Sequence, residues 1–295
     1  VRLQGLDLYA TELTLSSLVP TTVVLRGARL LEVSIALRGS ITLRVERSLA
    51  FEGVRIDSEA LSGQRPRVEL EEVRGQRLLL GSEQQPFAGE LLLARSHLTR
   101  SRLFASRVQL QSARLGDLAI ESDELEGTGA SLDRARLAFD EAVLSGSALS
   151  RVQIASCGSF TSIWSTIEQS LISACTSGPF HAYSTTVSGA LVDGPVDADR
   201  AEWNDVLLGL YEDTYMLGWD ITMRSATFCS GSRLLRLGGE STISCSDCTA
   251  AGFAHSDDIC IFPDTYLNAV GNNCPELERV TVCPASVPQV LEPMP

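Results

Sequence analysis

Short runs of alternating apolar and polar residues fill the first half of the chain. The clearest runs place aliphatic side chains two positions apart, at Leu6 and Leu8, at Val33, Ile35 and Leu37, and at Ile41, Leu43 and Val45. Such alternation, interrupted every few residues by glycine, serine or a charged pair, is typical of short β-strands with one buried face. The sequence therefore predicts that residues 1–156 are mainly β and contain many short strands.

A second pattern repeats a small residue followed two positions later by an aliphatic one. It recurs in steps of five at Ser96-His97-Leu98, Ser101-Arg102-Leu103 and Ser106-Arg107-Val108, and continues with a changing step at Ala135-Arg136-Leu137. The regular part resembles the pentapeptide-repeat family, whose units carry a small residue two positions before a central Leu or Phe in a square β-helix. The chain as a whole is more similar to right-handed parallel β-helix (β-solenoid) proteins of bacterial surfaces, which have irregular turns.

The physical reason for a solenoid is that one short turn cannot bury its inward residues alone. Stacked turns share a continuous column of small and aliphatic side chains. An antiparallel β-sandwich is the alternative, and it would favour hairpin dipeptides such as Asn-Gly or Asp-Gly. Only Asp193-Gly194 is of this kind. We therefore expect an all-β solenoid over residues 1–156.

Residues 157–283 are expected to continue the solenoid or to cap it. Apolar residues between the first two cysteines recur at helical spacing, which predicts an inserted amphipathic α-helix near 160–175: Phe160, Ile163, Trp164, Ile167, Leu171 and Ala174. The final segment, 284–295, contains four prolines and is expected to be an extended tail.

All eight cysteines lie in residues 157–283, and the even number favours a disulfide-rich region formed in an oxidising compartment. The predicted location is therefore extracellular, on the cell surface or in the periplasm. A helix between the first two cysteines would hold them roughly 20 Å apart, too far for a bond between those two. The disulfide candidates are Cys157, Cys175, Cys229, Cys245, Cys248, Cys260, Cys274 and Cys283.

Metal binding is the alternative for the later cysteines. Cys245, Cys248, His255 and Cys260 form C-x2-C-x6-H-x4-C, which resembles a zinc knuckle. The knuckle pattern has four residues before the histidine where this chain has six, and acidic residues replace the basic ones that contact nucleic acid. We therefore prefer disulfides and assign no metal and no cofactor.

The acidity is concentrated in the second half of the chain. The formal net charge is -13, with 20 acidic and 19 basic residues in 1–156 but 17 acidic and 5 basic residues in 157–295. An acidic surface repels phosphate backbones, so nucleic acid is excluded as a partner of that part. No run reaches the roughly 20 consecutive apolar residues that a transmembrane helix needs.

Residues that could carry chemistry are sparse. The chain contains no G-x-S-x-G, H-E-x-x-H or phosphate-binding P-loop motif, and its three histidines, His97, His181 and His255, lie far apart. Asp257 and Asp258 faintly resemble the aspartate pair of polygalacturonases. The Asn-Thr-Asp, His-Gly and Arg-Ile-Lys elements of that family are missing, which favours a solvated acidic turn. We assign no catalytic residue.

These observations predict a non-enzymatic structural or adhesive module of a bacterial cell surface or extracellular assembly. Its partners would be other proteins or further copies of itself, as in a self-assembling filament subunit. The alternative function is a carbohydrate-active β-helix enzyme that acts on an acidic polysaccharide.

Overall fold

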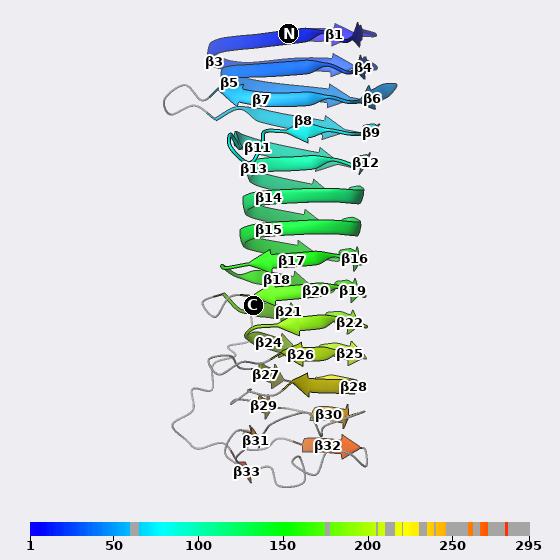
Figure 1. The fold of residues 1–295 in the computed structure, drawn as a ribbon, viewed down its shortest axis with the longest axis vertical. Helices are drawn as coiled ribbons and strands as arrows, with labels where there is room; N and C mark the ends of the chain where they lie inside the picture. Colours follow the sequence, from blue (N-terminus) through cyan, green and yellow to red (C-terminus); the bar gives the residue numbers. More distant parts are fainter. Residues whose placement is uncertain are drawn as a thin grey trace.

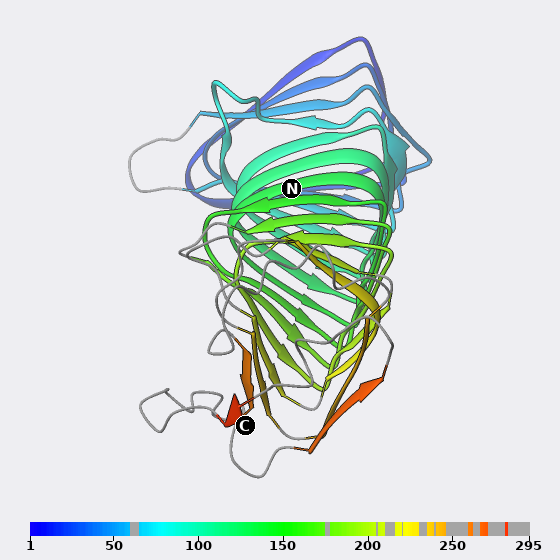
Figure 2. The same cartoon turned by 60° about the horizontal axis from the view of Figure 1, so that its bottom comes forward.

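The computed structural model describes residues 1–59, 65–174, 178–204, 206–209, 216–219, 221–229, 235–238, 240–245, 259–261, 266–270 and 281–282. In these residues the chain is a parallel β-solenoid of about 10 turns. Successive turns stack along the long axis of the molecule (Figure 1). Strands of neighbouring turns lie side by side, as the rotated view also shows (Figure 2).

The strands are short in most turns and long where they run through a corner. The first half contains β1 (Arg2–Gln4), β2 (Asp7–Tyr9), β3 (Glu12–Arg26), β4 (Arg29–Leu31), β5 (Ser34–Glu46), β6 (Ala50–Glu52), β7 (Arg55–Glu59), β8 (Arg67–Glu71), β9 (Arg74–Gln76), β10 (Leu79–Leu80), β11 (Phe87–Ala94), β12 (His97–Thr99), β13 (Arg102–Gln111), β14 (Arg114–Thr128), β15 (Ser131–Ser145), β16 (Ala148–Ser150) and β17 (Gln153–Ser156). The second half contains β18 (Phe160–Ile163), β19 (Thr166–Glu168), β20 (Leu171–Ala174), β21 (Phe180–Tyr183), β22 (Thr186–Ser188), β23 (Leu191–Asp193), β24 (Val196–Asp199), β25 (Glu202–Asn204), β26 (Leu207–Gly209), β27 (Met216–Trp219), β28 (Thr222–Cys229), β29 (Leu235–Gly238), β30 (Glu240–Cys245), β31 (Ile259–Ile261), β32 (Tyr266–Val270) and β33 (Thr281–Val282).

Each full turn contributes to three parallel ladders, and β14 passes through all of them. Its residues Arg114–Gly116 belong to ladder 1, Leu118–Ser122 to ladder 2 and Glu124–Thr128 to ladder 3, and all three pair in register with β15. Every described strand pairing is parallel, which confirms the β-solenoid and rules out the antiparallel sandwich for these residues. The right-handedness of the solenoid stays a prediction.

The spacing of the inward residues explains the sequence pattern. Inward side chains are two positions apart within a strand and three apart across a corner, as in Leu132, Ala135 and Leu137, which are each at most 2% exposed. Two plus three gives the five-residue step seen in the sequence, and Leu98 and Leu103 are indeed both buried. In the most regular turns Leu115 pairs with Leu132, seventeen residues later. One continuous apolar column therefore forms the core.

The predicted amphipathic helix near 160–175 is wrong, because the described residues there form β18, β19 and β20. The inward positions are instead the buried Phe160, Ser162, Ser165, Ile167 and Ile172. Alternating steps of two and three, with exposed Trp164 and Leu171 beside them, imitate the three-and-four spacing of a helix. No helix occurs in any part of the chain that the structure describes, and so none there could cross a membrane.

Two of the three corners of each turn use a residue in the left-handed backbone region. Between ladders 1 and 2 this residue is charged in several turns, as at Arg100, Asp117, Arg134 and Arg151, with φ of 50° to 56°. Between ladder 3 and the next turn it is often glycine, as at Gly129 and Gly146. Left-handed conformations cost non-glycine residues of order 1 kcal/mol or more. The inter-turn hydrogen bonds at the same corners offset this cost, for example Arg151 N–H to Glu168 O at 2.9 Å.

Serine side chains at the inner side of the corners complete the hydrogen bonding. Ser147 Oγ accepts a bond from the Ala130 N–H at 3.2 Å, and Ser165 Oγ accepts one from the Ser147 N–H at 3.1 Å. Each hydroxyl also donates to a carbonyl oxygen two residues earlier, Ser145 O and Ile163 O. These buried polar groups are thus satisfied without water, which lets turns stack closely.

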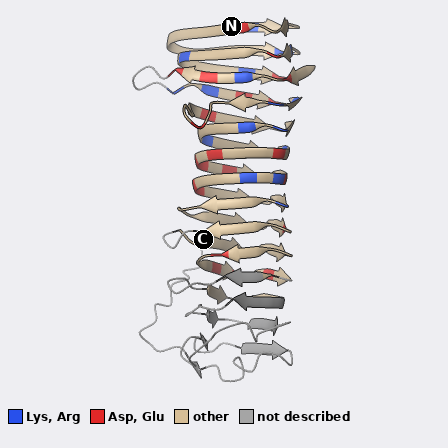
Figure 3. Ribbon diagram, in the orientation of Figure 1, with Lys and Arg blue, Asp and Glu red and all other residues tan. Residues whose placement is uncertain are grey.

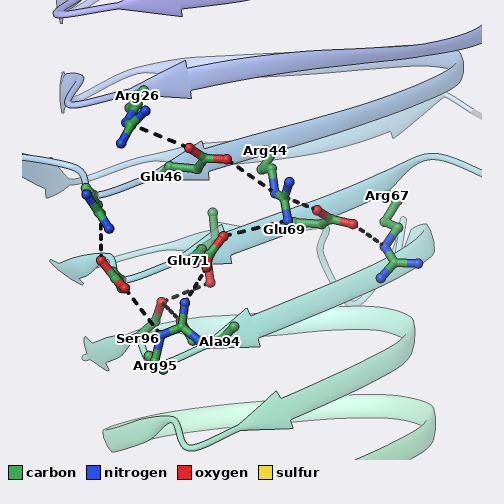
Figure 4. Close-up of polar contacts among 12 residues, drawn as sticks. Arg26, Arg44, Glu46, Arg67, Glu69, Glu71, Ala94, Arg95 and Ser96 are labelled. Atoms are coloured by element: carbon green, nitrogen blue, oxygen red, sulfur yellow. Dashed lines mark hydrogen bonds and ion pairs between the residues drawn. The ribbon is translucent and has the colours of Figure 1, made fainter.

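Charged side chains on the outer surface of the first half of the solenoid pair both within strands and across turns (Figure 3). On ladder 3, Arg44 Nε lies 3.0 Å from Glu69 on the next turn and 3.6 Å from Glu46 on its own strand, and Arg67 Nε lies 2.9 Å from Glu69 on its own strand (Figure 4). Arg26 extends the row to the preceding turn, 4.0 Å from Glu46. Exposed ion pairs are individually weak, but together they leave little net charge on this face.

Replacement of Gly158 by alanine should destabilise the solenoid by about 1–3 kcal/mol. A Cβ at this position would overlap the backbone carbonyl oxygen of Asp140 on the preceding turn. Urea unfolding followed by circular dichroism measures the change. Gly116→Ala is the matched control, because the nearest atom to its Cβ, Thr99 Cγ2, is 3.7 Å away. Equal stability of the two variants would contradict the close approach of the turns.

Acid should weaken the solenoid through its paired carboxylates. Hydrogen bonds from Arg107 lower the pKa of Glu126, and those from Arg47 lower the pKa of Glu72. A depressed carboxyl pKa contributes stability that is present above the unfolded-state value and is lost as pH falls. The free energy of unfolding should therefore decrease between about pH 5 and about pH 3. Glu126→Gln should reduce that decrease by less than about 1 kcal/mol, and a steeper decrease in the variant would contradict the pairing.

Candidate functional site

A groove of about 680 Å³ runs along the solenoid at the corner between ladders 2 and 3. It crosses successive turns from β13 to β20, and the residue that follows each ladder-2 segment forms its edge. Its lining residues are Pro86, Ala88, Phe104, Ala105, Ser106, Glu121, Ser122, Asp123, Ala138, Phe139, Asp140, Ala155, Ser156, Cys157 and Ser173.

The register of ladder 2 builds the floor of the groove. Phe104 pairs with Glu121, Glu121 with Ala138, Ala138 with Ala155, and Ala155 with Ser173. After the Phe104 ring and Glu121, three small side chains follow one another on neighbouring turns. Because alanine and serine extend little above the strand, this part of the surface is hollow relative to its margins. Phe104 and Pro86 provide an apolar wall at one end.

Three carboxylates lie in the groove: Glu121, Asp123 and Asp140. Asp123 and Asp140 occupy equivalent corner positions of adjacent turns, since the flanking residues pair as Ser122 with Phe139 and Glu124 with Glu141. Adjacent strands are about 4.8 Å apart, so two negative charges lie close together. The groove therefore has a negative edge beside an apolar floor.

These three carboxylates have no ion-pair or hydrogen-bond partner among the residues that the structure describes. Four other acidic residues of β14 and β15 do pair with arginine: Asp117 with Arg134, Glu124 and Glu126 with Arg107, and Asp133 with Arg151. Glu141 of β15 lies outside the groove and also has no described partner, but all three carboxylates that line the groove lack one, so their charge is available to a ligand.

Ser122 adds a buried polar atom to the groove lining. Its side chain is 8% exposed, and its Oγ is a buried atom with no hydrogen-bond partner within the described part of the chain. A buried hydroxyl without a partner costs about 1–3 kcal/mol. Its register partners Ala105 and Phe139, and Ser156 on the turn after Phe139, are buried as well, so this hydroxyl faces the interior of the solenoid and not the open groove.

A second group of polar side chains lies on the outer face of ladder 3. His181 Nδ1 is 3.1 Å from Asp197 Oδ2, and these residues are register partners on β21 and β24. Asp197 is only 9% exposed, and its Oδ1 has no hydrogen-bond partner among the described residues. Tyr183 stacks beside His181 with ring centroids 6.2 Å apart, and burial, followed by the charges of Asp197 and Asp199, raises the pKa of Tyr183.

The two groups lie at ion-pair distance, but His181 Nδ1 makes no hydrogen bond to any described residue, so the carboxylate does not fix the orientation of the imidazole. Among the described residues, no group of three or more His, Cys, Asp or Glu side chains is arranged to hold a metal ion. The pair is therefore a close contact of two polar groups without a neighbouring set of described ligands for a metal.

His97 lies elsewhere, on β12 in ladder 1. There it lines a depression of about 360 Å³ with Phe51, Arg74, Gln76 and other residues of β6 and β9. The structure thus places His97 on a different ladder from His181. His255 lies outside the described residues, as do Asp257 and Asp258.

The cysteines of the predicted disulfide-rich region are only partly described. Cys157 follows β17 at the groove edge and is disulfide-bonded. The strands β28, β30 and β31 contain Cys229, Cys245 and Cys260. The other four cysteines lie outside the described residues: Cys175, Cys248, Cys274 and Cys283. A disulfide-rich region is therefore not supported by the described residues.

The helix that separated Cys157 from Cys175 in the sequence-based argument is absent. Ser156 and Ala174, which precede these two cysteines, are register partners on adjacent turns. Helix length therefore does not exclude a bond between Cys157 and Cys175.

Comparison with known proteins does not change this description. No family model matches the chain, and no curated protein is similar to it.

The sequence analysis missed the groove carboxylates. Asp123 and Asp140 are separated by the same seventeen residues as Leu115 and Leu132. Because this separation equals the length of one turn, the two carboxylates lie on adjacent turns. The five-residue step did not reveal that length, because ladder 2 adds a further inward position, with Leu118, Ile120 and Ser122 all buried.

Neutralising the groove should leave the fold intact. The double change Asp123→Asn and Asp140→Asn removes two like charges that have no described partner, so the free energy of unfolding should stay within about 0.5 kcal/mol or rise slightly. Asp133→Asn is the contrasting variant, since it removes a carboxylate that pairs with Arg151. Thermal unfolding of the three proteins measures the difference. A large loss of stability in the double variant would show that the groove charges are structural.

Proposed function

We propose that this chain is a non-enzymatic structural or adhesive module of a bacterial cell surface or extracellular assembly. The parallel ladder supports this proposal most directly. Its in-register pairing continues over about 10 turns and fixes the spacing of every outward column. Such an architecture suits a stiff spacer that presents binding residues at defined distances.

The distribution of charge supports binding that is confined to one part of the solenoid. In the first turns, outward arginine and glutamate side chains pair with one another within strands and across turns (Figure 4). Such a surface is largely self-neutralised and offers little net attraction to a charged partner. The groove on β13 to β20 presents carboxylates without described partners, so adhesion would be concentrated there.

Cys157 supports the proposed location. It is disulfide-bonded, and structural disulfides persist mainly in oxidising compartments. The periplasm, the cell surface and the extracellular medium all fit this property. A self-assembling filament remains one form that such a module would take, with the solenoid turns as its repeating units.

Surface labelling tests the proposal. Antibodies raised against the chain should bind intact cells or the extracellular matrix of the organism that encodes it, and external protease should remove the signal. Deletion of the gene should reduce attachment of the cells, and expression of the chain should restore it. A chain confined to the cytoplasm, or attachment unaffected by deletion, would contradict the proposal.

A carbohydrate-active enzyme is the second candidate, and the His181–Asp197 pair is the observation in its favour. The acidic groove opposes an acidic polysaccharide as the substrate because like charges repel. A reducing-sugar assay on acidic polysaccharides distinguishes the functions. We expect no release of sugar above that of a His181→Ala, Asp197→Asn double variant. Activity that this variant loses while still folded would favour the enzyme.

A further inference from the structure

We propose that the groove on β13 to β20 binds an extended basic segment of a partner protein. This inference rests on the proposed adhesive function and names the chemistry of its partner. The observations that carry it are the open groove of about 680 Å³, the three exposed carboxylates without described partners, and the small and apolar side chains beside them.

The charge of the groove selects a cation. Glu121, Asp123 and Asp140 line it, and no arginine is among its lining residues. The attraction of lysine or arginine side chains to these carboxylates would be opposed by little desolvation, because all three carboxylates are exposed. An acidic polysaccharide or a nucleic acid would instead be repelled.

The floor of the groove favours a polypeptide over a small polyamine. Ala138, Ala155 and Ser173 form a flat strip, and the Phe104 ring and Pro86 add apolar surface at one end. Long basic side chains cover apolar surface with their methylene groups while their charged ends contact carboxylates.

The length of the groove sets the length of the segment. From β13 to β20 it crosses four steps between turns, which is about 19 Å at about 4.8 Å a step. An extended chain rises about 3.3 Å per residue, so about six residues would fill the groove along the solenoid axis. The paired corner positions of Asp123 and Asp140 then lie within reach of alternate side chains of that segment.

Binding of a fluorescent peptide to the intact chain tests this inference. The probe is a hexapeptide of alternating lysine and alanine, with alternating glutamate and alanine as the negative control, and fluorescence anisotropy gives the affinity. We expect the basic peptide to bind and the acidic one not to bind. Affinity should fall with salt, since exposed ion pairs are screened.

Two variants locate the site. Asp123→Asn with Asp140→Asn should weaken binding at least about fivefold, and Ala155→Arg should do the same by adding bulk and positive charge to the exposed floor. The matched control is Glu141→Gln with Glu168→Gln, which makes an equal charge change at exposed residues that do not line the groove. The control should bind as the unmodified chain does.

Each result of the binding experiment either supports or overturns the inference. Equal binding by all variants would indicate unspecific attraction to an acidic surface and would overturn the inference, as would absence of binding at millimolar peptide. Displacement by spermine with no preference for the peptide would also overturn it, in favour of a polyamine site. Loss of peptide binding does not affect the surface-labelling result, so the inference and the proposed function can fail independently.

Discussion

In-register parallel stacking of the turns is the constraint on which the rest of this structure depends. Each inward side chain lies directly over its counterpart one turn away, so that Leu115, Leu132 and Leu149 form one column. A single turn of this length would expose nearly all of its apolar surface. Stacking buries that surface and at the same time completes the backbone hydrogen bonds. The outward columns, including those of the groove, follow from the same register.

Stacking also explains the composition of the surface. Ion pairs link arginine and glutamate within strands and across turns, as Arg26 with Glu46 and Arg44 with Glu69 (Figure 4). Like charges lie on adjacent turns at Glu46 and Glu71 and at Glu124 and Glu141, but in each case at least one carboxylate pairs with an arginine. Asp123 and Asp140 also lie on adjacent turns, and neither has a described partner. This lack of pairing is the reason for proposing a partner at the groove.

The sequence predicted strands correctly where the alternation of buried and exposed residues lies within a single strand. Alternation identified strands such as Ser34–Glu46, whose buried positions alternate along its whole length. It failed at Phe160–Ala174, because corners add a residue and change the spacing from two to three, which imitates a helix. It could not find the groove either, since Glu121, Ala138 and Ala155 come together only through the length of a turn. The left-handed corners at Arg134 and Arg151 have no glycine signal, and only the stacked hydrogen bonds explain them.

Distances along one outward column test the stacking most directly. Spin labels attached to non-natural amino acids leave the eight cysteines unchanged, and Arg114, Thr186 and Glu202 of ladder 1 are outward positions separated by whole turns. The backbone separations are expected to be about 19 Å for Arg114 and Thr186 and about 24 Å for Arg114 and Glu202. The label-to-label distance measured by pulsed electron paramagnetic resonance should therefore increase by about 4.8 Å for the added turn. Distances that do not increase by one strand spacing per turn would contradict the in-register parallel stack.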